Sequence, residues 1–118
     1  MATYSKSLLS GSVNGQQIKI TGTTSGSATP LHTSVSGTSS LDEVWLYAYN
    51  ENLSNVQVSI LWGNTTEPDS VVRTTLPSQA GRTLVVDGKL LQNSLVVSAY
   101  ASVANVIMFD GFVNQIAP

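Results

Sequence analysis

Short apolar runs that alternate with a period of two residues are the feature that most constrains the fold of this chain. The clearest run is Ser54–Trp62, in which alternate residues are apolar: Val56, Val58, Ile60 and Trp62. Successive side chains of a strand point to opposite faces, so this segment is predicted to be a strand with one buried face. Gln17–Thr21 and Leu95–Ser102 alternate in the same way. No window has apolar residues at three- and four-residue spacing over several turns, so no long helix is expected.

Further runs rich in Val, Ile, Thr and Tyr predict strands at Ser5–Val13, Pro30–Val35, Asp69–Leu76, Arg82–Asp87 and Asn105–Ile116. Turn-forming residues separate the strands at Asn14-Gly15, Asn50–Asn52, Gly63–Asp69, Ala80-Gly81 and Asp87-Gly88. Asp110-Gly111 is expected to form a turn or bulge in the last strand, and Gly22–Ser40 to form long loops around one strand. Eight or nine short strands, with no helix for parallel crossovers, predict an all-β fold. We expect a single antiparallel β-sandwich resembling a jelly roll over residues 1–118, with residues 1–13 as a candidate N-terminal arm.

Both faces of Glu43–Asn50 are apolar, with small aliphatic residues alternating with aromatic ones: Val44, Leu46 and Ala48 against Trp45, Tyr47 and Tyr49. A strand of this kind is covered on both sides. One face can meet the core of a sandwich, so the aromatic face needs a loop or a second subunit as its cover. Trp and Tyr are enriched at protein interfaces, so we expect Trp45, Tyr47 and Tyr49 to be interface residues. A sugar-stacking platform is the alternative use of these rings.

The charge content is low for a soluble protein and argues for contacts with other proteins. Charged residues make up 10% of the chain and apolar residues 42%, with a net charge of −2. A surface with few charges repels its neighbours weakly, which suits dense packing of subunits; a β-protein with Ser/Thr-rich loops is the simpler explanation. The five cations are scattered, so no nucleic-acid partner is expected: Lys6, Lys19, Arg73, Arg82 and Lys89. Cysteine is absent, which excludes disulfides and thiolate chemistry.

No targeting or membrane segment is expected. The first eleven residues lack the basic and apolar regions of a secretory signal. No run approaches the roughly 18 apolar residues of a spanning helix. We therefore expect synthesis in a host cytoplasm and no membrane partner.

Residues suited to catalysis or metal binding are few. His32 is the single histidine, and it is expected to hydrogen-bond to backbone in a strand or loop. Asp42 and Glu43 would face opposite sides of a strand and so cannot share one site. Glu67 and Asp69 could reach one cation together with neighbouring oxygens, but a solvated loop is the preferred interpretation. We therefore predict that the protein is not an enzyme and that it binds no cofactor and no metal.

From Asp42 onward the chain resembles small virion proteins of tailed bacteriophages. The resemblance rests on Asp42–Ala48, Ile60–Gly63, Leu90–Asn93 before Leu95–Val97, and Gly111–Ile116. It implies a structural component of the particle, such as a capsid decoration (cement) protein that binds the major capsid protein on the outer surface of the head. The resemblance also implies self-association, often as a homotrimer, and it carries no catalytic residues. The first forty residues fall outside it.

The sequence offers two further candidate interface residues and two alternative functions. Tyr4 and Leu8, in the candidate arm, join Trp45, Tyr47 and Tyr49 as predicted interface residues. A tail, neck or tail-fibre component and a carbohydrate-binding β-sandwich module remain the alternatives to capsid decoration.

Overall fold

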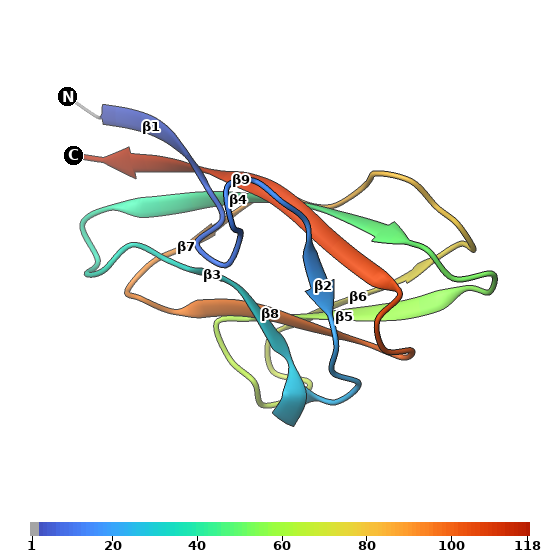
Figure 1. Ribbon diagram of the computed structural model, residues 1–118. Helices are drawn as coiled ribbons and strands as arrows, with labels where there is room; N and C mark the ends of the chain where they lie inside the picture. Colours follow the sequence, from blue (N-terminus) through green and yellow to red (C-terminus); the bar gives the residue numbers. More distant parts are fainter. Residues whose placement is uncertain (1–2) are drawn as a thin grey trace.

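The protein is a sandwich of two antiparallel sheets, here in a computed structural model that describes residues 3–118 (Figure 1). These residues form nine strands and one short 3-10 turn, η1, at Ser25–Ser27. The strands are β1 Thr3–Leu8, β2 Ile18–Ile20, β3 Thr29–Thr33, β4 Leu41–Asn50, β5 Val56–Trp62, β6 Val71–Leu76, β7 Thr83–Leu91, β8 Val96–Ala101 and β9 Ile107–Ala117. The described residues include no helix with the length and apolarity needed to cross a bilayer.

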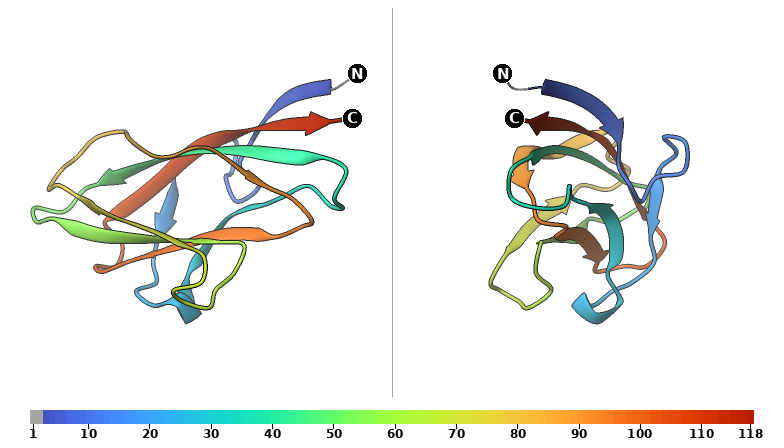
Figure 2. Two further views of the ribbon diagram at one scale, coloured as in Figure 1. Left: turned by 180° about the vertical axis from the view of Figure 1, so that it is seen from behind. Right: turned by 90° about the vertical axis from the view of Figure 1, so that its left-hand side faces the viewer.

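The order of the strands is that of a jelly roll. The first sheet has the order β1-β9-β4-β7, with β2 also paired to β9, and the second has the order β3-β8-β5-β6. From β2 onward, consecutive strands alternate between the two sheets except at the β5–β6 hairpin, as the two layers in Figure 2 show. This alternation produces the paired Greek keys of a jelly roll. The predicted all-β fold class is therefore confirmed.

The core lies between the sheets and contains the residues that the period-two pattern predicts. Alternate residues of β4, β5 and β8 are buried there: Val44, Leu46, Ala48, Val56, Val58, Ile60, Trp62, Val97, Ala99 and Ala101. Burial of this apolar surface, worth roughly 25 cal/mol per Å², holds the two sheets together. On the opposite face of β5, Ser59 and Leu61 are buried as well. The prediction of a single buried face for this strand was therefore incomplete.

Two predictions of where a strand is interrupted are wrong, and each concerns a glycine. Asp87-Gly88 was expected to be a turn, but β7 continues through it as a bulge beside Trp45. Asp110-Gly111 was expected to break or bulge the last strand, but β9 pairs with β4 without interruption. A Cβ atom at Gly111 would lie 2.0 Å from the carbonyl oxygen of Trp45, so the missing side chain lets the two strands approach.

The N-terminal segment is part of the first sheet. β1 pairs with the second half of β9 in an unbroken register from Thr3 opposite Ala117 to Leu8 opposite Phe112. The predicted strand Ser5–Val13 thus begins earlier and ends at Leu8. Met1 and Ala2, at the start of the candidate arm, lie outside the described residues.

Candidate interaction surface

All five predicted interface residues lie on the outer side of the first sheet. Leu8, Phe112 and Trp45 form one row across β1, β9 and β4, because directly opposite residues of antiparallel strands share a face. Tyr4 lies in a parallel row through Ile116. Tyr47 and Tyr49 project to the same side of β4 as Trp45, opposite to the buried residues. We call this side, which carries Tyr4, Leu8, Trp45, Tyr47, Tyr49 and Phe112, the aromatic face.

Trp45 is held in place from three directions at the centre of the aromatic face. Its ring stacks on Phe112, with centroids 5.9 Å apart and planes 11° apart. The indole also lies against Gly88, where a Cβ atom would come within 3.0 Å of it. Its Nε1–H donates a hydrogen bond of 2.7 Å to Oε1 of Glu43, and Nδ2 of Asn114 donates one of 3.0 Å to the same oxygen. Both hydrogen bonds lower the pKa of Glu43, and the one from Asn114 has the larger effect.

Two cations, Lys6 of β1 and Arg82 just before β7, lie over other rings of the aromatic face. Nζ of Lys6 is 4.4 Å from the ring centroid of Phe112, and Cζ of Arg82 is 3.6 Å from that of Tyr47. Nε of Arg82 also lies 3.6 Å from Oδ1 of Asp110. These long side chains cover part of the apolar surface while their charged ends stay near water.

Tyr49 is tied to β9 by a side-chain hydrogen bond. Its hydroxyl donates to Oδ2 of Asp110 over 2.8 Å. Burial, followed by the contact with Asp110, raises the pKa of Tyr49, because both favour the neutral phenol. The hydroxyl therefore acts as a fixed donor at neutral pH.

The aromatic face keeps exposed apolar surface around this ordered centre. Tyr4 is 72% exposed and Leu8 is 52% exposed, while Trp45, Tyr47 and Tyr49 are half-buried. On the opposite edge, β7 adds the exposed side chains of Leu84 and Leu90, which pair with Tyr47 and Glu43. The apolar surface thus extends across the whole width of the sheet.

His32 forms a buried pair with Asp42. Its Nδ1 accepts a hydrogen bond of 2.9 Å from the backbone N–H of Ser10, so the ring proton is on Nε2. Nε2–H donates to Oδ2 of Asp42 over 2.7 Å. The prediction of a backbone-bonded histidine is confirmed. Since both ring nitrogens are engaged, the imidazole has no lone pair available to take a proton from a substrate.

Sequence reasoning missed this partnership. Asp42 has the same parity along β4 as Val44 and Leu46, and all three are buried. A buried acidic residue needs a hydrogen-bond partner. The position of Asp42 in the inward-facing row of β4 was therefore the signal that could have identified His32, the single histidine of the sequence, as its partner. Glu43 faces outward, so the prediction that Asp42 and Glu43 cannot share a site is confirmed.

The acidic turn before β6 is occupied by contacts within the protein. Glu67 forms an ion pair with Arg73 and accepts a hydrogen bond of 2.6 Å from the hydroxyl of Tyr100. Asp69, in the same turn, is exposed. Within residues 3–118 no three His, Asp or Glu side chains gather as metal ligands would.

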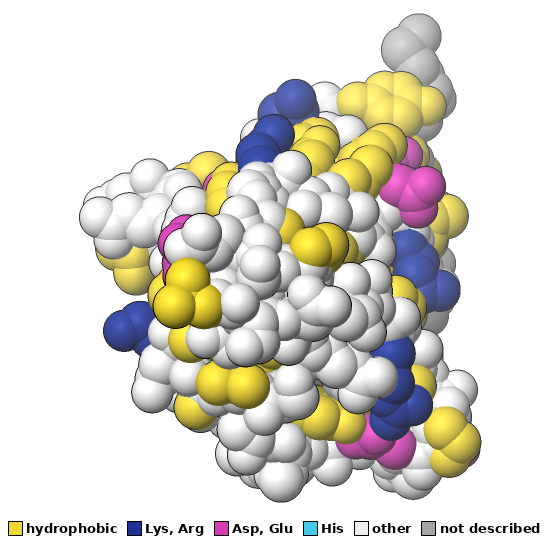
Figure 3. Space-filling view, turned by 90° about the vertical axis from the view of Figure 1, so that its right-hand side faces the viewer, with side chains coloured by type: hydrophobic (Ala, Val, Ile, Leu, Met, Phe, Trp, Pro, Cys, Tyr) yellow, Lys and Arg dark blue, Asp and Glu magenta, His cyan; other side chains and the backbone are white. Residues whose placement is uncertain are grey.

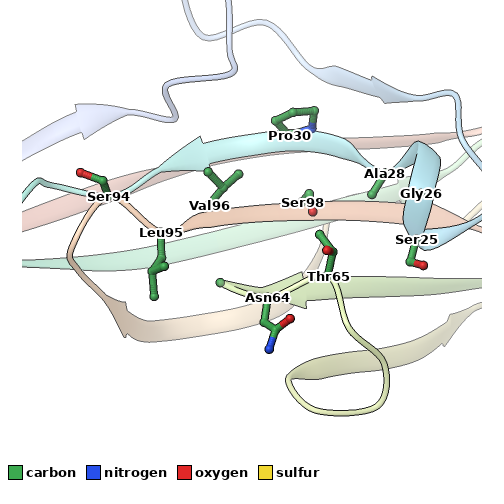
Figure 4. A pocket seen from close by; sticks show the side chains of 11 residues that line it. Ser25, Gly26, Ala28, Pro30, Asn64, Thr65, Ser94, Leu95, Val96 and Ser98 are labelled. Atoms are coloured by element: carbon green, nitrogen blue, oxygen red, sulfur yellow. The ribbon is translucent and has the colours of Figure 1, made fainter.

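Hydroxyl and aliphatic groups line a hollow on the outer side of the second sheet. It has a volume of about 650 Å³ and lies between the segments around Ser25, Thr65 and Val96 (Figure 4). No charged or aromatic side chain lines it. A second hollow lies beside Trp62 and Lys89, and neither is lined by His32 or Asp42. Figure 3 shows one end of the molecule, where most side chains are uncharged and the charged ones lie towards the margins.

The predicted interface residues are therefore brought together on one face of the first sheet, with aromatic rings at its centre and exposed apolar groups around them. No protein-family model, curated protein or solved structure matches this chain.

Proposed function

We propose that this chain is a structural protein of a tailed-phage virion, and most specifically a capsid decoration protein that binds the outside of the head. One observation carries the proposal: Tyr4, Leu8, Trp45, Tyr47 and Tyr49 lie on one side of one sheet. Aromatic residues are enriched in protein interfaces, where rings held in place lose little entropy on binding. The aromatic face is the proposed contact with the capsid or with further subunits.

Two properties of the surface support an assembly role. Few charges face solvent, so copies packed side by side on a shell repel each other weakly. Each Å² of apolar surface that is buried contributes roughly 25 cal/mol, and many repeated contacts add up on a shell even where single contacts are weak. In this mechanism the protein reinforces the head by joining capsid subunits.

The buried His32–Asp42 pair supports a non-enzymatic role. The single histidine is used to join Ser10, β3 and β4 and lines neither hollow. The proposed partners are the major capsid protein and other copies of this chain, on the capsid surface of the virion. The resemblance implies a homotrimer, and the mass of the purified protein distinguishes a homotrimer from a dimer or a single chain.

Binding to shells tests the proposal. The full chain is mixed with empty heads assembled from the major capsid protein of the same genome, and the heads are sedimented. We expect saturable binding at hundreds of copies per head and a higher temperature of head disruption. No co-sedimentation would contradict a decoration role, and a few copies per purified virion would indicate a tail or neck component instead.

A carbohydrate-binding module is the second candidate, favoured by the exposed ring of Tyr4 on the aromatic face. A ring face can stack on the apolar face of a sugar. Binding on a glycan array that is lost in Tyr4→Ser would support this candidate over decoration.

A further inference from the structure

One edge of β1 is free. β1 pairs with β9 along one side, and no strand within residues 3–118 pairs with its other side. All six of its residues are exposed. A free edge presents unpaired N–H and C=O groups, which form a template for another strand.

β1 has fewer of the features that protect an edge strand than the opposite edge of the sheet. Its register is unbroken, it contains no proline, and Lys6 is its one charged residue. β7 at the opposite edge differs, since two bulges interrupt its pairing and Asp87 and Lys89 are both exposed on it. The edge of β1 is therefore the more open of the two to pairing with another strand.

We propose that the strand it accepts is β1 of a second copy of this chain, paired antiparallel about a two-fold axis at Ser5. A two-fold axis perpendicular to the sheet places residues of the same face opposite each other. Only two registers then pair five residues of β1 in each copy: Thr3–Ser7 with Ser5 on the axis, and Tyr4–Leu8 with Lys6 on the axis.

Charge distinguishes the two registers. With Lys6 on the axis, two ammonium groups would lie directly opposite each other, which is destabilising. With Ser5 on the axis, Lys6 lies opposite Tyr4 of the second copy, so no like charges face each other and the ammonium keeps its place over Phe112 of its own chain. Thr3 then lies opposite Ser7, a pair able to form a hydrogen bond. The strand is thus complementary to itself in one register.

The pairing joins the first sheets of two copies into one continuous sheet. Both aromatic faces then lie on the same side, because the two-fold axis is perpendicular to the sheet. The pairing does not depend on the proposed role in the head, although it would present two aromatic faces to one shell.

A cysteine scan of β1 tests the register, because the chain has no cysteine of its own. In Ser5→Cys, the two cysteines would have Cα atoms about 4.5–5.5 Å apart, within the range of a disulfide. Ser7→Cys is the matched control, since Ser7 is exposed on the same face of β1 but lies roughly 13 Å along the strand from its symmetry mate. The double variant Tyr4→Cys/Leu8→Cys tests the rival register, in which Tyr4 lies opposite Leu8 of the second copy, and it keeps the charge of Lys6. We expect mild oxidation to produce a covalent dimer of Ser5→Cys and to leave the other two variants as single chains on a non-reducing gel.

The mass of the unsubstituted protein gives an independent result. Light scattering should give twice the 12.4 kDa of one chain. A single-chain mass at all concentrations, a three-chain mass, or equal cross-linking of Ser7→Cys would overturn the pairing, and preferential cross-linking of Tyr4→Cys/Leu8→Cys would overturn the register. A single chain that still binds heads would contradict the pairing alone, whereas a dimer that ignores heads would contradict the proposed function alone.

Discussion

Asp42 and His32 show how one buried polar pair joins three segments of a small sandwich. Asp42 is 3% exposed and His32 is 6% exposed. Oδ2 of Asp42 accepts hydrogen bonds from Nε2–H of His32 and from the backbone N–H of Val35, while Nδ1 of His32 accepts from Ser10. The loop after β1, strand β3 and strand β4 are therefore held together by hydrogen bonds, and the two that end on the Asp42 carboxylate are charge-assisted.

Removing the Asp42 carboxylate should leave Nε2–H of His32 and the backbone N–H of Val35 without a hydrogen-bond acceptor. We expect Asp42→Ala to lower the free energy of unfolding by roughly 2–4 kcal/mol, because unsatisfied buried donors are costly. Asp42→Asn keeps one acceptor oxygen and should lose less. Urea unfolding measures both variants, and an Asp42→Ala protein as stable as the unsubstituted one would contradict this role.

Glu43 should contribute to stability in a pH-dependent way. Its pKa in the folded protein is lowered from 4.5 by the hydrogen bonds from Asn114 and Trp45. The contribution is therefore present above about pH 4.5 and is lost as the pH falls through the folded-state pKa. In urea unfolding from pH 7 to pH 3, the stability difference between the unsubstituted protein and Glu43→Gln should shrink as the pH falls. Glu51→Gln, an exposed control, should show a smaller change, and a constant difference for Glu43→Gln would contradict the linkage.

Individual strands differ in how far the sequence could predict them. Period-two alternation predicted β4, β5 and β8 together with their core-facing residues, but it did not predict that Ser59 and Leu61 on the other face of β5 are also buried. It failed at Gly88 and Gly111, where the backbone depends on Trp45 of a different strand. A glycine that permits a close approach cannot be told from a turn glycine without knowing which strand lies beside it.

Gly111 offers a direct test at the scale of the β4–β9 pair. We expect Gly111→Ala to destabilise the protein by roughly 2 kcal/mol or more, because its Cβ would clash with the Trp45 carbonyl. Gly81→Ala is the control, since no atom lies within 4 Å of a Cβ placed there. Thermal unfolding compares the two, and equal stability would show that β9 can move away from β4 without cost.

For the molecule as a whole, the sequence could predict which residues lie on the aromatic face but not how they contact one another. That Trp45, Tyr47 and Tyr49 lie on the same side of β4 follows from their two-residue spacing in the sequence. The stacking of Trp45 on Phe112 and the position of Lys6 depend on the pairing of β1, β9 and β4, which are distant in the sequence. Local patterns do not fix such registers, and this is why the covering cations and the free edge of β1 required the structure.

Head binding by surface variants tests the central claim, that the aromatic face is the contact surface, most directly. The double variant Tyr4→Ser/Leu8→Ser removes exposed apolar groups from that face, and Leu53→Ser removes one of 79% exposure from outside it. We predict that the double variant co-sediments with empty heads at least about tenfold more weakly, a loss of roughly 1.4 kcal/mol, while Leu53→Ser binds normally. Unchanged binding of the double variant, or an equal loss in Leu53→Ser, would contradict the claim.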